Sequence, residues 1–225
     1  QSVTYRALDA ACQRTGLSPE RLLLKVGAVS SPRLVHVCRF ERLHFPRGTG
    51  FAESLTQDFA PPDLSGLPEA TVETFSVDDE TTTEIDDCLS MQSLPNGRLR
   101  LGVHIAVPAL GIRAGDPLDK VARERMTTVY SPGSKITMLP EPVVRAYSLD
   151  AGTERPALSL YVDVDPGNMQ VLEQFSRVDR IRVTTNLRHG EFAGFDDEER
   201  FDSGDLAGLP HADAFAALWR FTVAQ

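Results

Sequence analysis

The chain has 225 residues, and its composition, 41% hydrophobic and 24% charged, is that of an ordinary globular protein. Its formal net charge is −9. No apolar run approaches the roughly 20 residues that a membrane-spanning helix needs, so we expect no membrane partner. The first residues, QSVTYRALDA, lack the pattern of a secretory signal. Cys12, Cys38 and Cys88 form no C-x-x-C pair, which argues against a disulfide framework or a cysteine zinc site and favours a cytoplasmic protein.

Charge is distributed unevenly along the chain. Residues 1–50 hold eight Arg and Lys against three Asp and Glu, whereas residues 51–225 hold fifteen against twenty-nine. The sequence therefore suggests a basic module joined to an acidic one, and the net charge does not exclude a nucleic-acid partner.

Residues 1–50 show the pattern of three short helices. The first is predicted to end at Gly16, and a serine followed by proline opens each of the next two, at Ser18 and at Ser31. Short helices with tight turns and surplus arginine are typical of a helix-turn-helix or winged-helix module. A nucleic-acid-binding module and a plain packing module both remain open.

Residues 51–70 are rich in Pro, Gly and Ser and are predicted to be a linker. After them, apolar strand patterns alternate with helical ones, and Asn96-Gly97 marks a tight hairpin turn. Residues 71–225 are therefore predicted to form an α+β domain. Strands are expected at residues 75–77, 88–94, 98–107, 156–165 and 171–183.

Helices are predicted over residues 116–130 and 211–225. The second of these reaches the last residue without a C-cap signal, so we expect the domain to continue in a longer protein. A second acidic segment, FDDEERFDSGD at residues 195–205, lacks flanking strands and is predicted to be a solvated loop.

The stretch SVDDETTTEIDDCLS, residues 76–90, holds six carboxylates between Asp78 and Asp87 and no basic residue. A calcium-binding EF-hand loop starting at Asp78 would need Gly where the chain has Thr83 and Glu where it has Leu89, so that site is excluded. A solvated loop stays an alternative, but apolar residues interleave with the acids and would hold them in place. Fixed carboxylates without basic neighbours suit Mg²⁺ or Mn²⁺, and such a site can promote phosphodiester hydrolysis.

Four segments in this order resemble the catalytic domain of the ribonuclease II family, the RNB domain, over about residues 70–190. They are VDDETTTEIDDCLS, LRLGVHIAVPAL, GDPLDKVARERMTTVYSPGSKITMLPE and AYSLDAGTERPALSLYVDVD. Members of this family hydrolyse single-stranded RNA processively from its 3′ end with Mg²⁺ and release nucleoside 5′-monophosphates. The resemblance implies the same activity here, in a monomer of bacterial type. Its N-terminal module is helical where the family usually has cold-shock OB-folds.

The family's acidic motif has carboxylates at a first position and then six, eight and nine residues later. In this chain those positions are Asp78, Glu84, Asp86 and Asp87, and the resemblance implies that all four are catalytic metal ligands. Glu84 stands where the family usually has aspartate, and its extra methylene moves the carboxylate by about one bond length, so it is expected to reach the metal or to act through a water.

The resemblance also implies substrate-binding residues. Tyr130 matches a family tyrosine that packs against bases near the RNA 3′ end, as a sequence-tolerant nuclease requires. Arg125 matches an arginine expected either to contact the RNA backbone or to pin the acidic loop. His104 matches a histidine expected to be structural. A further arginine and an S1 domain that the family carries lie outside these 225 residues.

Two departures keep a second hypothesis open, that of a catalytically inactive RNA-binding or regulatory protein on the same fold. Val107 stands where the family often has aspartate, and a second family aromatic aligns with Asn186. Restored cleavage in Glu84→Asp would favour this hypothesis. A third hypothesis, a helix-turn-helix DNA regulator with a metal-sensing acidic domain, requires duplex DNA binding that survives loss of residues 51–225.

Overall fold

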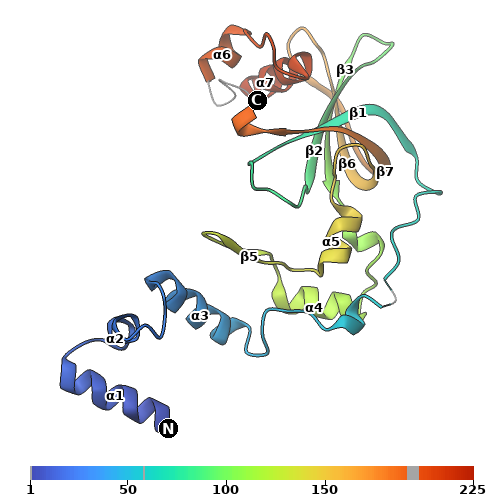
Figure 1. Ribbon diagram of the computed structural model, residues 1–225. Coiled ribbons are helices and arrows are strands. Elements are labelled where there is room, and N and C mark those ends of the chain that lie inside the picture. Colours follow the sequence, from blue (N-terminus) through green and yellow to red (C-terminus); the bar gives the residue numbers. More distant parts are fainter. Residues whose placement is uncertain (1, 58, 192–197) are drawn as a thin grey trace. The chain divides into compact units, whose positions relative to one another are not determined.

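The computed structural model describes residues 2–57, 59–191 and 198–225. It consists of two compact units, Gln1–Ala52 and Glu53–Gln225, shown in Figure 1. The predicted combination of helices and strands in an α+β fold is confirmed.

The first unit contains three helices, in the region where the sequence predicts them. An N-cap serine opens each helix and accepts a hydrogen bond from the backbone N–H three residues further on. Among the described residues of this unit, Leu22 alone is buried, so the helices share only a small apolar contact. The helices are α1 (Val3–Thr15), α2 (Pro19–Lys25) and α3 (Pro32–His44).

The second unit is built on a closed five-stranded barrel with the order β1-β2-β3-β6-β7. Neighbouring strands are antiparallel, except that β1 and β7 close the barrel in parallel. Closure removes the free edges that an open sheet would expose. The strands are β1 (Glu69–Asp78), β2 (Asp87–Ser93), β3 (Leu99–Ala106), β6 (Glu154–Val164) and β7 (Val171–Arg188).

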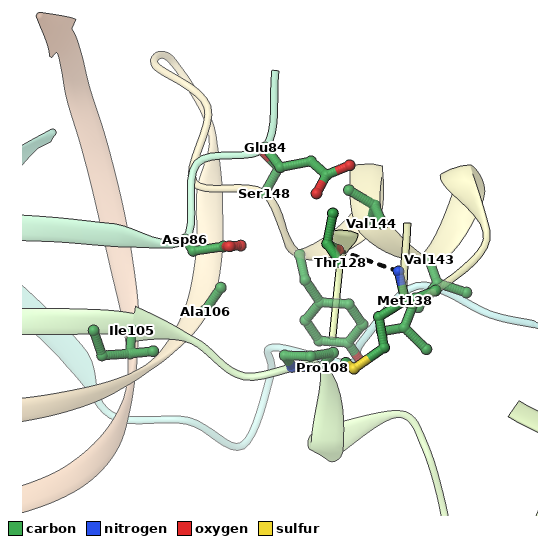
Figure 2. Close-up of a pocket in the computed structure, with 12 residues that line it drawn as sticks. Glu84, Asp86, Ile105, Ala106, Pro108, Thr128, Met138, Val143, Val144 and Ser148 are labelled. Atoms are coloured by element: carbon green, nitrogen blue, oxygen red, sulfur yellow. Dashed lines mark hydrogen bonds between the residues drawn. The ribbon is translucent and has the colours of Figure 1, made fainter. Parts of the chain in front are cut away.

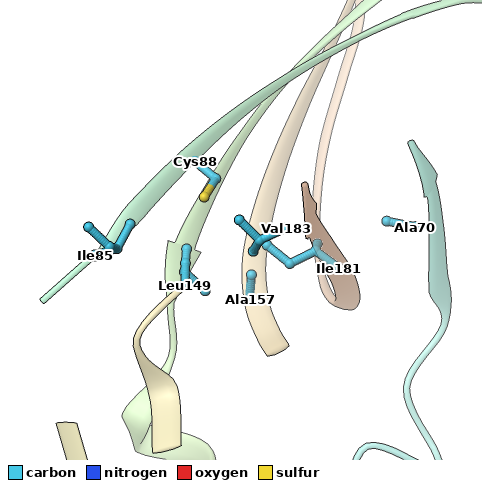
Figure 3. Packing of buried hydrophobic residues seen from close by; sticks show 7 residues of the cluster. All are labelled: Ala70, Ile85, Cys88, Leu149, Ala157, Ile181 and Val183. Carbon is cyan, nitrogen blue, oxygen red and sulfur yellow. The ribbon is translucent and has the colours of Figure 1, made fainter. Parts of the chain in front are cut away.

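Apolar residues on alternate positions of these strands form the barrel core (Figure 3). Ile85, from the connection between β1 and β2, and Leu149, from the loop before β6, complete this core and are 1% and 0% exposed. The acidic stretch is therefore anchored in the core through Ile85. The cluster consists of Ala70, Ile85, Cys88, Leu149, Ala157, Ile181 and Val183.

The barrel interior also contains a buried histidine. His104 of β3 is 0% exposed, and its two ring nitrogens lie 2.8 Å from the hydroxyls of Ser90 and Ser159. Burial lowers the pKa of His104 to about 4, so the ring is neutral at physiological pH. A side chain enclosed in this way serves the packing of the barrel.

A helical segment connects β3 to β6 and differs from the prediction for residues 116–130. Helix α4 ends at Arg125, because Met126 adopts a left-handed backbone conformation with φ 65°. The β-branched residues that follow favour extended structure, and Tyr130 lies on a strand. The elements are α4 (Pro117–Arg125), β4 (Val129–Ser131), β5 (Ser134–Ile136) and α5 (Glu141–Tyr147), with short 3₁₀ turns at Glu53–Leu55 and Pro108–Leu110.

Two apolar clusters attach the helices of the second unit, one at α4 and α5 and one at the C-terminal helix. Leu55 and Phe59, from the segment that the sequence suggests as a linker, pack against the cluster formed by α4 and α5. Helix α7 (Ala212–Ala224) packs with Phe215 against Phe75 of β1. No helix in the described part of the chain is long and apolar enough to span a bilayer.

In the part of the second acidic segment that the structure describes, residues 198–205, the predicted solvated loop is not found. The first three residues of the segment lie outside the described residues, and the next six form helix α6 (Glu198–Ser203). Phe201 joins the apolar cluster under α7, and the Trp219 indole N–H donates to Asp202 at 2.9 Å. A short 3₁₀ turn, His189–Glu191, precedes this segment.

Candidate functional site

The strand ends bring the acidic residues to one end of the barrel. Asp78 is the last residue of β1 and Asp87 the first residue of β2. Because β1 and β2 are antiparallel neighbours, the end of one lies beside the start of the other. Glu84 and Asp86 lie in the connection between the two strands. The fold thus places all four predicted carboxylates on a single strand connection.

Asp78 is held by a short hydrogen bond. The Ser76 hydroxyl donates to its carboxylate at 2.6 Å, and the Arg188 guanidinium lies 4.0 Å away. The same guanidinium donates to the backbone carbonyl of Asp79 at 3.1 Å. The position of the Asp78 carboxylate is therefore fixed by β1 itself and by the adjacent strand β7.

The surroundings of Asp86 and Asp87 disfavour the ionised form of both carboxyl groups. Burial raises the pKa of the Asp86 carboxyl, and the charges of the other three carboxylates raise it further, while Lys135 opposes this. Burial and the charge of Asp78 likewise raise the pKa of Asp87. Such crowding stores electrostatic repulsion that a bound cation would relieve.

Glu84 has a partner that the sequence analysis did not identify. The Lys135 ammonium group, on β5, lies 2.7 Å from the Glu84 carboxylate and donates to the Thr83 hydroxyl at 2.6 Å. The Glu84 side chain is only 11% exposed, so this ion pair is largely shielded from water. Lys135 thereby ties the β4–β5 hairpin to the acidic stretch.

We expect Lys135→Met to destabilise the protein by about 1–2 kcal/mol at neutral pH, because it leaves the Glu84 charge shielded and unpaired. Urea denaturation at pH 7 measures the change. Lys120→Met, on the exposed surface of α4, is the matched control and should change the free energy of unfolding little. Equal stability of the wild type and Lys135→Met would show that the ion pair contributes nothing.

The β4–β5 hairpin carries the predicted stacking residue. Tyr130 pairs with Lys135 across the hairpin, and 70% of its surface is exposed. Tyr130, Lys135 and Glu84 line a common pocket of about 610 Å³. An exposed ring and a carboxylate therefore face the same space.

Arg125 lies at the base of this hairpin. Its guanidinium donates to the backbone carbonyl of Thr137 at 2.8 Å, and burial lowers its pKa. This contact bridges the end of α4 and the strand-to-helix segment after β5. The structure thus places Arg125 where it supports the hairpin that bears Tyr130.

A second pocket, of about 280 Å³, opens beside Glu84 and Asp86 (Figure 2). Its remaining walls are mostly apolar and come from the end of β3, the hairpin segment and α5. Two carboxylates at the edge of an apolar pocket can bind a group that carries a positive charge at one end and is apolar at the other. The other lining residues are Ile105, Ala106, Pro108, Thr128, Met138, Leu139, Val143, Val144, Tyr147 and Ser148.

The donor set has the chemistry of a site for a hard divalent cation, since all four side chains offer carboxylate oxygen. Their arrangement is not that of a completed shell. Within residues 2–57, 59–191 and 198–225, no group of three or more His, Cys, Asp or Glu side chains is placed to hold a metal ion together.

The comparisons with known proteins identify the family. The RNB domain matches residues 67–191. Exoribonuclease 2 of Vibrio cholerae is 42% identical over 108 residues, which cover 48% of this chain and 15% of that protein. The chain spans between 15% and 17% of the length of the first three curated relatives that it matches.

Solved structures with the same fold include one described as an exoribonuclease and one described as a pseudonuclease. The Dss1 exoribonuclease of Candida glabrata, solved as an active-site mutant, has a TM-score of 0.61 at 19% identity, over 76% of this chain and 23% of that one. Yeast Ssd1, described as a pseudonuclease, has a TM-score of 0.59 at 20% identity, over 73% of this chain and 20% of that one. The resemblance found in the sequence is confirmed: the chain belongs to the RNB-domain family.

Proposed function

We propose that the chain is the catalytic part of a metal-dependent exoribonuclease, which degrades single-stranded RNA processively from its 3′ end to nucleoside 5′-monophosphates. The observation that carries this proposal is the crowding of four carboxylates at one strand connection, where burial and then the acidic neighbours raise the pKa of Asp86. Membership of the RNB-domain family supports it, as does the name of the Vibrio cholerae relative.

Asp78, Glu84, Asp86 and Asp87 would hold the cation, which is Mg²⁺ with Mn²⁺ as a substitute. Bound there, the ion would activate a water molecule and neutralise charge on the scissile phosphate. Burial and the neighbouring carboxylates raise the pKa of both Asp86 and Asp87, and a bound cation would favour their ionised, ligating forms. Glu84 would have to exchange its Lys135 partner for the ion or act through a water.

The β4–β5 hairpin would position the RNA substrate. We propose that the exposed ring of Tyr130 stacks on a base near the RNA 3′ end, which any base allows because every base has a flat face. Arg125 would act through its bond to Thr137, which holds the hairpin in place. The basic residues of the first unit would attract RNA in a salt-dependent manner. We expect a monomeric, cytoplasmic protein.

A catalytically inactive RNA-binding protein is the second candidate. The Glu84–Lys135 ion pair favours it, because a carboxylate occupied by lysine is not free for a metal. The fold also occurs in a protein described as a pseudonuclease. Both candidates predict RNA binding, and only the first predicts turnover.

The deciding experiment is a gel time-course with the full-length protein on 5′-labelled single-stranded RNA, in Mg²⁺ or in EDTA. Asp87→Asn serves as the control for a contaminating nuclease. Shortening from the 3′ end that requires the metal and is lost in Asp87→Asn would support the exoribonuclease. Intact RNA in a protein that binds it would leave the inactive binding protein.

A further inference from the structure

A hydrogen-bond network centred on Asn186 joins the two ends of the acidic stretch. We infer that Asn186, together with Ser76, is a positioning residue that sets the spacing between Asp78 and the carboxylates at Asp86 and Asp87. This inference rests on the proposed metal site. It gives Asn186 a role in metal binding, in place of the base contact that its alignment with a family aromatic suggests.

The first branch of the network reaches Asp78. The Asn186 amide donates to the Ser76 hydroxyl at 2.9 Å, across the parallel pairing of β1 and β7. Because that hydroxyl oxygen accepts from Asn186, its own proton is directed to Asp78, to which it donates at 2.6 Å. Ser76 is 1% exposed, so water cannot take over either contact.

The second branch reaches the backbone between Glu84 and Asp86. The same Asn186 amide donates to the Leu149 carbonyl at 3.0 Å. Leu149 in turn donates through its backbone N–H to the Ile85 carbonyl at 2.9 Å, and the Ile85 N–H donates to the Ser148 hydroxyl at 3.1 Å. Both backbone groups of Ile85 are thus held by the loop that Asn186 binds.

The partners themselves dictate the identity of residue 186. The Ala151 backbone N–H donates to the Asn186 side-chain oxygen at 2.7 Å, whereas Ser76 and Leu149 both require a donor. Only a side chain with one acceptor and two donors on a single flat group satisfies all three. An aspartate would lose both donors and add a charge near Asp78, and an aromatic ring would satisfy none of the three partners.

The network therefore links two strands and two loops that are far apart in sequence and that meet at the carboxylates. Changes to groups that orient metal ligands commonly cost about 10–100-fold in metal affinity. We expect loss of the Asn186 amide or of the Ser76 hydroxyl to weaken metal binding about tenfold. Because both act through one chain of bonds, the effects of the two changes should not add.

Isothermal titration of the full-length protein with Mn²⁺, without RNA, tests the inference on Asn186→Ala, Ser76→Ala and the double variant. Ser76→Thr keeps a hydroxyl and should retain the affinity. Thr74→Val is the matched control: Thr74 is buried on the same face of β1, and its hydroxyl donates to the Arg182 carbonyl and not to a carboxylate. Thermal unfolding of every variant establishes that it is folded, and Ser76→Ala is the milder change if Asn186→Ala does not fold.

Reduced Mn²⁺ affinity in Asn186→Ala and Ser76→Ala, with wild-type affinity in Thr74→Val, is the expected result. Unchanged affinity in both would overturn the inference while leaving the metal site intact. A wild type that does not bind Mn²⁺ would contradict the metal site itself and the inference with it. Asn186→Tyr provides a further check: stronger RNA binding at unchanged Mn²⁺ affinity would show that position 186 contacts bases.

Discussion

Asp86→Asn is expected to abolish RNA hydrolysis and at the same time to stabilise the protein at neutral pH. The loss of activity follows from the proposed role of Asp86 as a metal ligand. Loss of a metal ligand should lower the cleavage rate by more than roughly 100-fold, which is the upper range for changes to the groups that only orient the ligands. The cleavage rate on labelled RNA at saturating Mg²⁺ measures this effect.

The gain in stability follows from the raised pKa of Asp86. In the unfolded chain the carboxyl titrates near its ordinary value, so between that value and the higher folded pKa the native state binds more protons. Stability therefore falls as the pH rises through this window, and at pH 7 the native state carries a charge that it disfavours. Asparagine resembles the protonated form and removes this cost.

The thermal midpoint of Asp86→Asn, measured without divalent cations, should exceed that of the wild type at pH 7. The difference should shrink as the pH is lowered below the ordinary carboxyl pKa, where the aspartate is protonated in both states. Saturating Mg²⁺ should stabilise the wild type and not the variant. A lower midpoint for the variant at pH 7 would mean that the Asp86 charge is compensated in the native state.

Acidification is expected to destabilise the wild type through His104 by roughly 3 kcal/mol. The pKa of this ring is lowered to about 4 in the folded state, against 6.5 for an ordinary histidine. Below pH 6.5 the unfolded chain binds a proton at this histidine, whereas the native state does not. The free energy of unfolding therefore decreases as the pH falls from 6.5 towards 4. Protonation would also add a proton donor where the ring now faces two serine hydroxyls.

His104→Gln removes the titrating group and keeps a polar side chain. Urea denaturation of both proteins between pH 7 and pH 4 gives the difference in the free energy of unfolding, from which the other titrating groups cancel. At pH 7 the wild type should be the more stable, and the difference should narrow by roughly 3 kcal/mol at pH 4. A difference that is independent of pH would show that His104 titrates alike in both states.

Local patterns made much of the fold predictable. Serine caps followed by proline mark the second and third helices, and alternating apolar residues mark the barrel strands, because both signals depend on near neighbours in the chain. The prediction for residues 116–130 was wrong at its end. A left-handed backbone at Met126 stops the helix five residues early, and the β-branched residues after it were the signal in the sequence that the prediction overlooked.

The acidic motif was visible in the sequence because its members lie within ten residues of one another. Lys135 was missed because its partner Glu84 is about 50 positions away, and only the hairpin brings the two together. Asn186 was interpreted as a departure from the family pattern. Its contact to Ser76 exists because β1 and β7 close the barrel in parallel, and its contact to Leu149 because the loop before β6 lies against β7.

The amino-acid sequence thus determined which groups are available: a basic helical module, a row of carboxylates, a tyrosine suited to base stacking and strands that alternate in polarity. Tertiary structure decided how these groups are used. It set which carboxylate is paired with lysine and which buried hydroxyl is bound by Asn186, since those contacts join residues about 50 and 110 positions apart. Burial and electrostatic repulsion depend on which groups lie close together in space, and the folded barrel determines this.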